Sequence, residues 1–159
     1  MITNEQLQEI ADNLDFGLRC FIHKDNADIR CFPDEDQFGS FDDEAWQQDI
    51  QAVKKGRKKY LEIEKMPPRE EYGVMEAFAR QVEEGLLQEK LLWILNRPKP
   101  FRHFKAELDQ AGPYREKWFA FKAARMLDWV KGQVLYTPTC STSKRSQTGR
   151  LNVSGGRWP

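Results

Sequence analysis

The pattern of apolar and polar residues along the chain predicts a helix, two strands, a second helix, a third strand and then a series of helices. The first helix begins at a capping box formed by Thr3 and Gln6. Its apolar residues recur at helical spacing: Leu7, Ile10, Ala11 and Leu14. Alternating runs predict strands near residues 18–23, 28–33 and 59–64.

The first two strands are predicted to form a hairpin around the sequence KDNA, because Asp25 and Asn26 are typical turn residues. Pairing of His23 with Asp28 places one set of residues on a common face: Leu18, Cys20, Ile22, Ile29 and Cys31. The opposite face then carries Arg19, Phe21, His23, Arg30 and Phe32. We expect the first of these faces to be the core face.

Glycines and prolines divide the rest of the chain into helices. An acidic loop follows the hairpin, and Ser40 is predicted to cap a helix that ends at Gly56. Beyond the third strand, helices are expected from about Glu70, after Gly85, from Pro100, and from Pro113 to Tyr136. Residues 100–130 hold the densest group of aromatic side chains in the chain, which we expect to anchor the core.

This order of elements predicts a single α+β domain over residues 1–136. Its small three-stranded antiparallel sheet has the order 2-1-3 and is covered by about five to six helices. Residues 137–159 are basic and rich in Ser, Thr and Gly, with few apolar side chains, and are predicted to form a disordered tail.

Composition adds limits on function. The 159 residues are 40% hydrophobic and 31% charged, as in an ordinary soluble domain. Basic and acidic residues number 25 each, which argues against a dedicated nucleic-acid binder. No run approaches the roughly 20 apolar residues that cross a bilayer, and the first residues lack a secretory signal. We therefore expect a cytoplasmic protein with no membrane partner.

Several segments together resemble a bacterial protein family. These are FIHKDNADIRCFPDED, KYLEIE followed by prolines, MEAFARQV, RPKPFRHFKAEL and WFAFK, and they span about residues 16–130. In their order and spacing the chain is similar to the uncharacterised family numbered 0158 in the UPF series. The resemblance implies a shared fold and a bacterial source, but it carries no activity, because the family has none established.

Candidate catalytic and metal-binding groups do not form a recognisable site. Cys20, Cys31 and Cys140 lack the spacing of a zinc site, and we interpret Cys20 and Cys31 as buried, inert thiols. His23 and His103 are the only imidazoles, and no nucleophile pattern accompanies either. The acidic run 34–36 lacks the spacing of a calcium-binding loop. We predict no catalytic residue, no metal and no cofactor.

The strongest basic cluster admits two interpretations. It consists of Lys54, Lys55, Arg57, Lys58 and Lys59. Phosphate contacts would make the protein a nucleic-acid-associated one. We favour the alternative, in which these cations complement the C-terminus of the preceding helix.

The hypothesis we place first is a non-catalytic binding or regulatory module that recognises a protein or an anionic ligand. Its site is predicted on the last two helices, at Arg102, His103, Lys105, Tyr114, Arg115 and Lys122. Guanidinium and ammonium groups beside aromatic rings suit an acidic peptide or a phosphate-bearing ligand. Nucleic-acid association through the basic cluster is the alternative, and an enzyme of unknown reaction comes last. The oligomeric state is left open.

Overall fold

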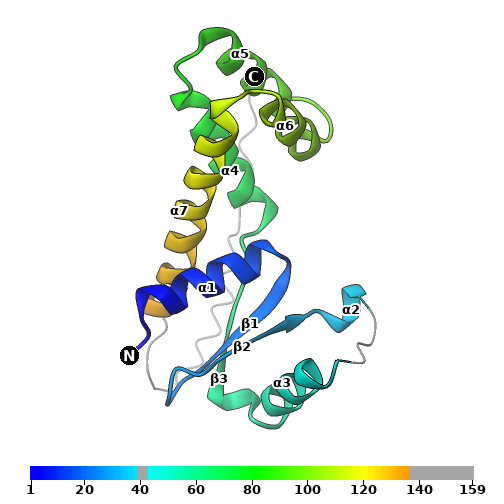
Figure 1. Ribbon diagram of the computed structural model, residues 1–159, viewed down its shortest axis with the longest axis vertical. Coiled ribbons are helices and arrows are strands. Elements are labelled where there is room, and N and C mark those ends of the chain that lie inside the picture. Colours follow the sequence, from blue (N-terminus) through cyan, green and yellow to red (C-terminus); the bar gives the residue numbers. More distant parts are fainter. Residues whose placement is uncertain (39–42, 137–159) are drawn as a thin grey trace, which may run out of the picture.

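The computed structural model describes residues 1–38 and 43–136. The strands are β1 (Leu18–His23), β2 (Ile29–Pro33) and β3 (Tyr60–Ile63). The helices are α1 (Asn4–Asp15), α2 (Glu35–Phe38), α3 (Glu44–Lys55), α4 (Pro68–Gln81), α5 (Gly85–Leu95), α6 (Pro100–Asp109) and α7 (Pro113–Tyr136). Figure 1 shows an elongated molecule with the sheet, α1 and α3 at one end and α5 and α6 at the other, connected by α4 and α7.

The sheet has the predicted order β2–β1–β3, and both strand pairs are antiparallel. Cys20 faces Cys31 in the hairpin, and the His23 amide donates to the Asp28 carbonyl, as the predicted register requires. The capping box of α1 is also present as predicted. None of the helices in the described part of the chain is both long and apolar enough to span a membrane.

One face of the sheet packs against α1 and α7. Cys20, Ile22 and Ile63 are buried there together with Ile10 of α1 and Val130 of α7. This is the face that the sequence pattern identified as the core face. The end of α7 is fixed to the sheet edge, because the Trp129 indole N–H donates to the Glu64 carbonyl at 2.8 Å.

The opposite face is buried as well, which the sequence-based prediction missed. Phe21 and Phe32 stack with ring centroids 5.2 Å apart, and α3 covers them with Ile50 and Val53. The connection from β2 to β3 must pass over β1, since these strands lie on its two sides. Because α1 already covers one face, α3 packs on the other.

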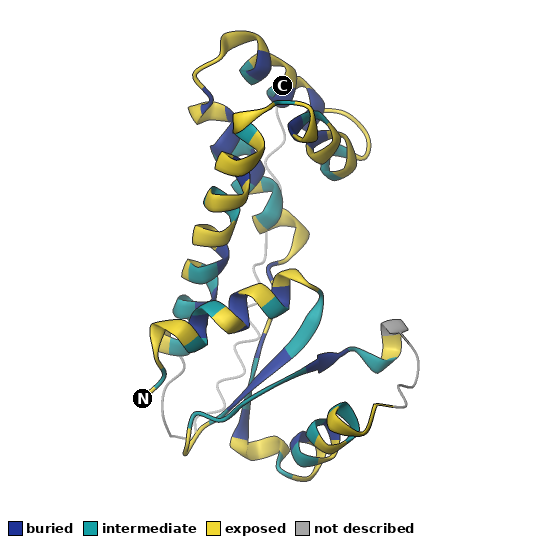
Figure 2. Ribbon diagram, viewed as in Figure 1, coloured by how far each residue is buried: buried dark blue, intermediate teal, exposed yellow. Residues whose placement is uncertain are grey.

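A second, all-helical core lies between α4, α5, α6 and the first half of α7. Its largest buried residues are Phe78, Leu91, Phe104, Leu108 and Trp118. The aromatic stretch at residues 100–130 therefore does anchor a core, as predicted. Helix α7 contributes Trp118 to this core and Val130 to the sheet core, which explains why its sequence is apolar on more than one side. Figure 2 shows buried positions at several points along α7.

Two local predictions concern the segment around residue 40. Asp43 caps α3, and its side chain accepts from the Ala45 amide at 2.9 Å. The predicted cap, Ser40, lies outside the described residues. Part of the predicted acidic loop is the short helix α2, whose first turn carries Glu35 and Asp36. The predicted tail at residues 137–159 also lies outside the described part of the chain.

Candidate functional site

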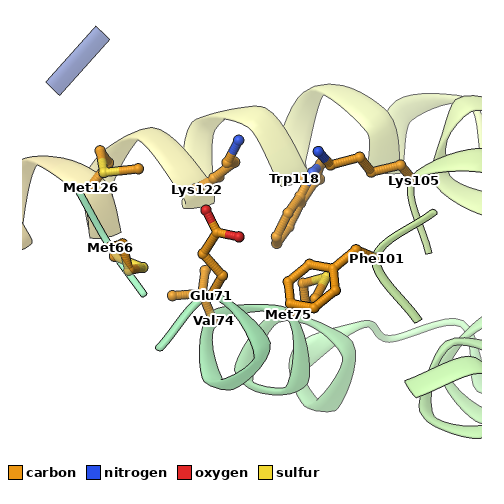
Figure 3. Close-up of a pocket in the computed structure, with 9 residues that line it drawn as sticks. All are labelled: Met66, Glu71, Val74, Met75, Phe101, Lys105, Trp118, Lys122 and Met126. Carbon is orange, nitrogen blue, oxygen red and sulfur yellow. The ribbon is translucent and has the colours of Figure 1, made fainter. Parts of the chain in front are cut away.

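A cleft opens where α4, α6 and α7 meet between the two cores (Figure 3). Its lining consists mainly of apolar side chains and includes three charged ones: Met66, Glu71, Val74, Met75, Phe101, Lys105, Trp118, Lys122 and Met126. Its volume is about 30 Å³, enough for about two water molecules. We call this feature the α4–α6–α7 cleft.

Helical spacing explains why these residues share one cleft. On α6, Phe101 and Lys105 are four residues apart, and on α7 Trp118, Lys122 and Met126 follow each other at the same interval. Side chains with this spacing lie one turn apart on the same side of a helix. Phe104 and Leu108 point into the helical core, so the neighbouring positions on α6 reach its edge.

Charges of both signs stand at the cleft. The Lys122 ammonium is ion-paired with Asp15 at the end of α1, which holds α7 against that helix. Figure 3 shows Glu71 reaching from α4 toward α7 and Lys105 reaching from α6 toward Trp118. Within residues 1–38 and 43–136, neither Lys105 nor Glu71 forms an ion pair. The cleft therefore has an apolar lining with an unpaired ammonium and an unpaired carboxylate.

The structure brings only part of the predicted ligand site together. Lys105 and Lys122 line the same cleft. His103 lies on a different surface, in a hollow between α5 and α6. The reason is angular, because residues two apart on a helix point about 200° from each other.

The other predicted site residues have local roles. The Arg115 side chain pairs with Asp109 at 3.1 Å and lies over the Phe119 ring at 4.9 Å. Tyr114 is partly buried against the helical core. Arg102 is exposed on α6. Whether these three residues contact a ligand stays a prediction.

The alternative basic cluster is partly neutralised by carboxylates. Lys54 pairs with Glu35 at 3.2 Å, and Arg57 pairs with Glu62 at 2.6 Å. The Arg57 guanidinium also lies 5.2 Å from the centroid of the Phe21 ring. The remaining members, Lys55, Lys58 and Lys59, are exposed. Two of the five cations are therefore engaged in local ion pairs near the end of α3, and whether the cluster contacts a nucleic acid stays a prediction.

The two hairpin cysteines differ in exposure. Cys20 is fully buried, and its Sγ lies 3.9 Å from the Ile10 carbonyl oxygen. Its hydrogen bond with Cys31, together with burial, raises the pKa of the Cys20 thiol. Cys31 is only partly buried. No group of three or more metal-ligating side chains occurs in the described part of the chain.

We expect a maleimide to label Cys31 before Cys20 under native conditions. Cys20 is inaccessible and protonated, whereas the reactive form of a cysteine is the exposed thiolate. Peptide mapping by mass spectrometry after a time course measures both rates, and labelling in urea provides the unfolded reference. Equal native rates at the two positions would show that the α1 side of the sheet opens readily.

Several residues of the cleft were not identified as site residues from sequence. Met75 was recognisable as apolar by helical spacing, but Glu71 looked like any charge in the first turn of a helix. Its position in the cleft depends on the packing of α4 against α7, about 50 positions later in the chain. No local pattern carries that information.

Comparison with known proteins finds one relationship. A model of the uncharacterised protein family UPF0158 matches residues 37–139. The match includes KYLEIE, MEAFARQV, RPKPFRHFKAEL and WFAFK, while FIHKDNADIRCFPDED ends one residue before it. No curated protein and no solved structure matches the chain significantly.

Proposed function

The chain belongs to the UPF0158 family, whose description assigns no activity, and we propose that it is a non-catalytic module that binds an acidic segment of a partner protein. The proposed site is the α4–α6–α7 cleft. The observation that carries this proposal is the unpaired Lys105 ammonium at the edge of an apolar cleft. A lone ammonium beside apolar surface suits a carboxylate that is attached to an apolar group.

The lining supports recognition of a side chain. Met66, Met75 and Met126 contribute flexible, polarizable groups, and Trp118 contributes a rigid aromatic ring. Methionine-rich surfaces adapt to the shape of an inserted apolar side chain. The small free volume means that the methionines must shift as a large side chain enters. A single anchoring residue is therefore the expected ligand group, with a neighbouring Asp or Glu against Lys105.

Lys122, the second lysine of the cleft, supports the proposal because its charge is held in a fixed position. Lys122 is the less exposed member of its pair with Asp15, with 21% of its side chain exposed against 47%. The pair holds the ammonium in place, as a binding site requires. Glu71 on the opposite wall disfavours a second acidic group there, which gives the ligand a preferred direction.

A displayed random-peptide library tests this proposal. Selection on the full chain is expected to enrich peptides with a large apolar residue next to Asp or Glu. Reversing one charge with Lys105→Glu should weaken binding of the selected peptides by at least about tenfold, the equivalent of 1.4 kcal/mol. Isothermal titration calorimetry with a selected peptide measures the change.

Lys55→Glu is the matched control, because it makes the same charge change on exposed α3, away from the cleft. It should leave peptide affinity unchanged. The proposal fails if no sequence is enriched, or if Lys105→Glu binds the selected peptides as tightly as Lys55→Glu does.

A further inference from the structure

Helix α5 carries large apolar side chains on two sides, and only one of these sides is buried by the residues that the structure describes. Its inner side buries Leu87, Leu91, Ile94 and Leu95 in the helical core. The outer stripe, at helical spacing, is Leu86, Lys90, Trp93 and Arg97. Leu86 is 80% exposed and Trp93 is 58% exposed. Two large apolar side chains therefore stand on one exposed stripe at the end of the molecule farthest from the sheet (Figure 1).

A groove runs beside this stripe, between α5 and α6. It consists of two adjoining hollows of about 330 and 470 Å³ that share Lys90, Glu107 and Gln110. The first hollow also contains Glu84 and Leu86. The second contains Trp93, Ile94, Arg97 and His103. We call the stripe and the groove together the α5 surface.

Charge is distributed unevenly along the α5 surface. Its first end carries Glu84, whose side chain does not cap the helix that it precedes. Its centre carries Lys90, paired with Glu107 at 2.8 Å. Its other end carries Arg97, which lies over the Trp93 ring at 4.3 Å. Neither Glu84 nor Arg97 forms an ion pair with another described residue. The surface is thus acidic at one end, neutral in the middle and basic at the other.

We propose that the α5 surface binds a second copy of this chain, with the two α5 helices antiparallel about a twofold axis near Lys90. This arrangement places Leu86 of each copy against Trp93 of the other, and Glu84 of each against Arg97 of the other. A twofold axis makes every such contact twice. The proposal rests on residues outside the α4–α6–α7 cleft and is independent of the function proposed for that cleft.

The spacing of the residues favours this register. Leu86 and Trp93 are about 10 Å apart along the helix, since each residue rises about 1.5 Å. Lys90 lies near the middle of both the Leu86–Trp93 and the Glu84–Arg97 intervals. The apolar contacts then flank the axis, and the ion pairs lie outside them. Near the axis, each Lys90 is paired with Glu107 of its own chain. The two ammonium groups that approach each other there are therefore both neutralised.

Charge complementarity favours a second copy of the chain as the partner and an antiparallel orientation of the two α5 helices. A parallel arrangement would place Glu84 against Glu84 and Arg97 against Arg97, and like charges in contact are unfavourable. The antiparallel arrangement replaces both contacts with ion pairs. A surface that is acidic at one end and basic at the other is complementary to itself after a twofold rotation.

Sedimentation equilibrium of the full chain over a concentration series tests the proposal. We expect a concentration-dependent dimer, and Trp93→Glu should weaken it by at least about tenfold, because it places charge in the apolar contact. Phe16→Glu is the matched control, since Phe16 is 89% exposed and directly follows α1, which Figure 1 shows beside the sheet and away from α5. It should dimerise like the unmodified chain.

A charge exchange tests the register. Arg97→Glu and Glu84→Arg should each weaken the dimer, and the double variant should restore it, because each ion pair is then re-formed with opposite polarity. Circular dichroism checks that all variants are folded. The proposal is overturned if the full chain is monomeric throughout the series, if Trp93→Glu leaves the dimer intact, or if the double variant is weaker than both single ones.

Discussion

Phe104→Ala is expected to lower the free energy of unfolding by about 3–5 kcal/mol, the usual cost of truncating a buried phenylalanine. Phe104 has no exposed surface and lies at the centre of the helical core. Its ring meets the Trp118 ring edge to face, with centroids 5.2 Å apart. The alanine variant loses this contact and leaves a cavity between α6 and α7. Urea denaturation followed by circular dichroism measures the change.

Phe119→Ala is the matched control for this prediction. Phe119 is on α7 but 48% exposed, and the Arg115 guanidinium lies over its ring. We expect a cost of about 1 kcal/mol or less, in the range of an exposed cation–π contact. Equal costs for the two variants would mean that the helical core does not depend on α6. In that case the wall of the cleft that carries Lys105 would not be held rigidly.

The parts of the fold that were predictable from sequence are those with local signals. The sheet order and register followed from alternation in the first two strands and from turn residues between them. The starts of α6 and α7 followed from Pro100 and Pro113, which suit the first position of a helix. One detail of the turn differs from the simplest expectation, because the left-handed residue is Ala27, with φ of 57°, rather than Asp25 or Asn26.

From sequence, the candidate site could be predicted only for residues whose proximity is set by one pair of neighbouring helices. Lys105 and Lys122 lie on α6 and α7, which the corner at Gly112 and Pro113 turns against each other, so their proximity could be inferred. His103 was grouped with them by its place in the sequence, and the rotation of α6 separates it. The position of Glu71 in the cleft could not be inferred, because it depends on how α4 packs against α7. That packing is set by two cores rather than by residues near Glu71 in the sequence.

The burial of the second face of the sheet likewise could not be predicted from the local sequence pattern. On this face Phe21 and Phe32 alternate with Arg19 and Arg30, so the sequence pattern predicts a half-exposed surface of apolar and charged side chains. In the structure, the charged side chains of this face form ion pairs at its edge. Arg19 pairs with Glu62 at 2.7 Å, and Arg30 pairs with Asp28 and Asp49. Hydrogen bonds to Asp49 and Asp28 raise the pKa of the Arg30 guanidinium. The phenylalanines between them are left to pack under α3.

Phe21→Ala should therefore cost about 3–5 kcal/mol, as much as a substitution in the helical core. Phe21 is on the central strand and 1% exposed. Its ring stacks on Phe32 and has the Arg19 and Arg57 guanidinium groups 5.3 and 5.2 Å from its centroid. Truncation removes the stacking, both cation–π contacts and the surface on which α3 packs. Phe21→Leu keeps most of the apolar volume and should cost less.

Urea denaturation of Phe21→Ala, Phe21→Leu and Phe16→Ala measures this prediction. Phe16 is 89% exposed, so its truncation should change the free energy of unfolding by no more than about 0.5 kcal/mol. If Phe21→Ala were as mild as Phe16→Ala, the α3 side of the sheet would contribute little to stability. The face that bears Cys20 and Ile22 would then be the sole core of the sheet, as the hydrophobic pattern alone had indicated.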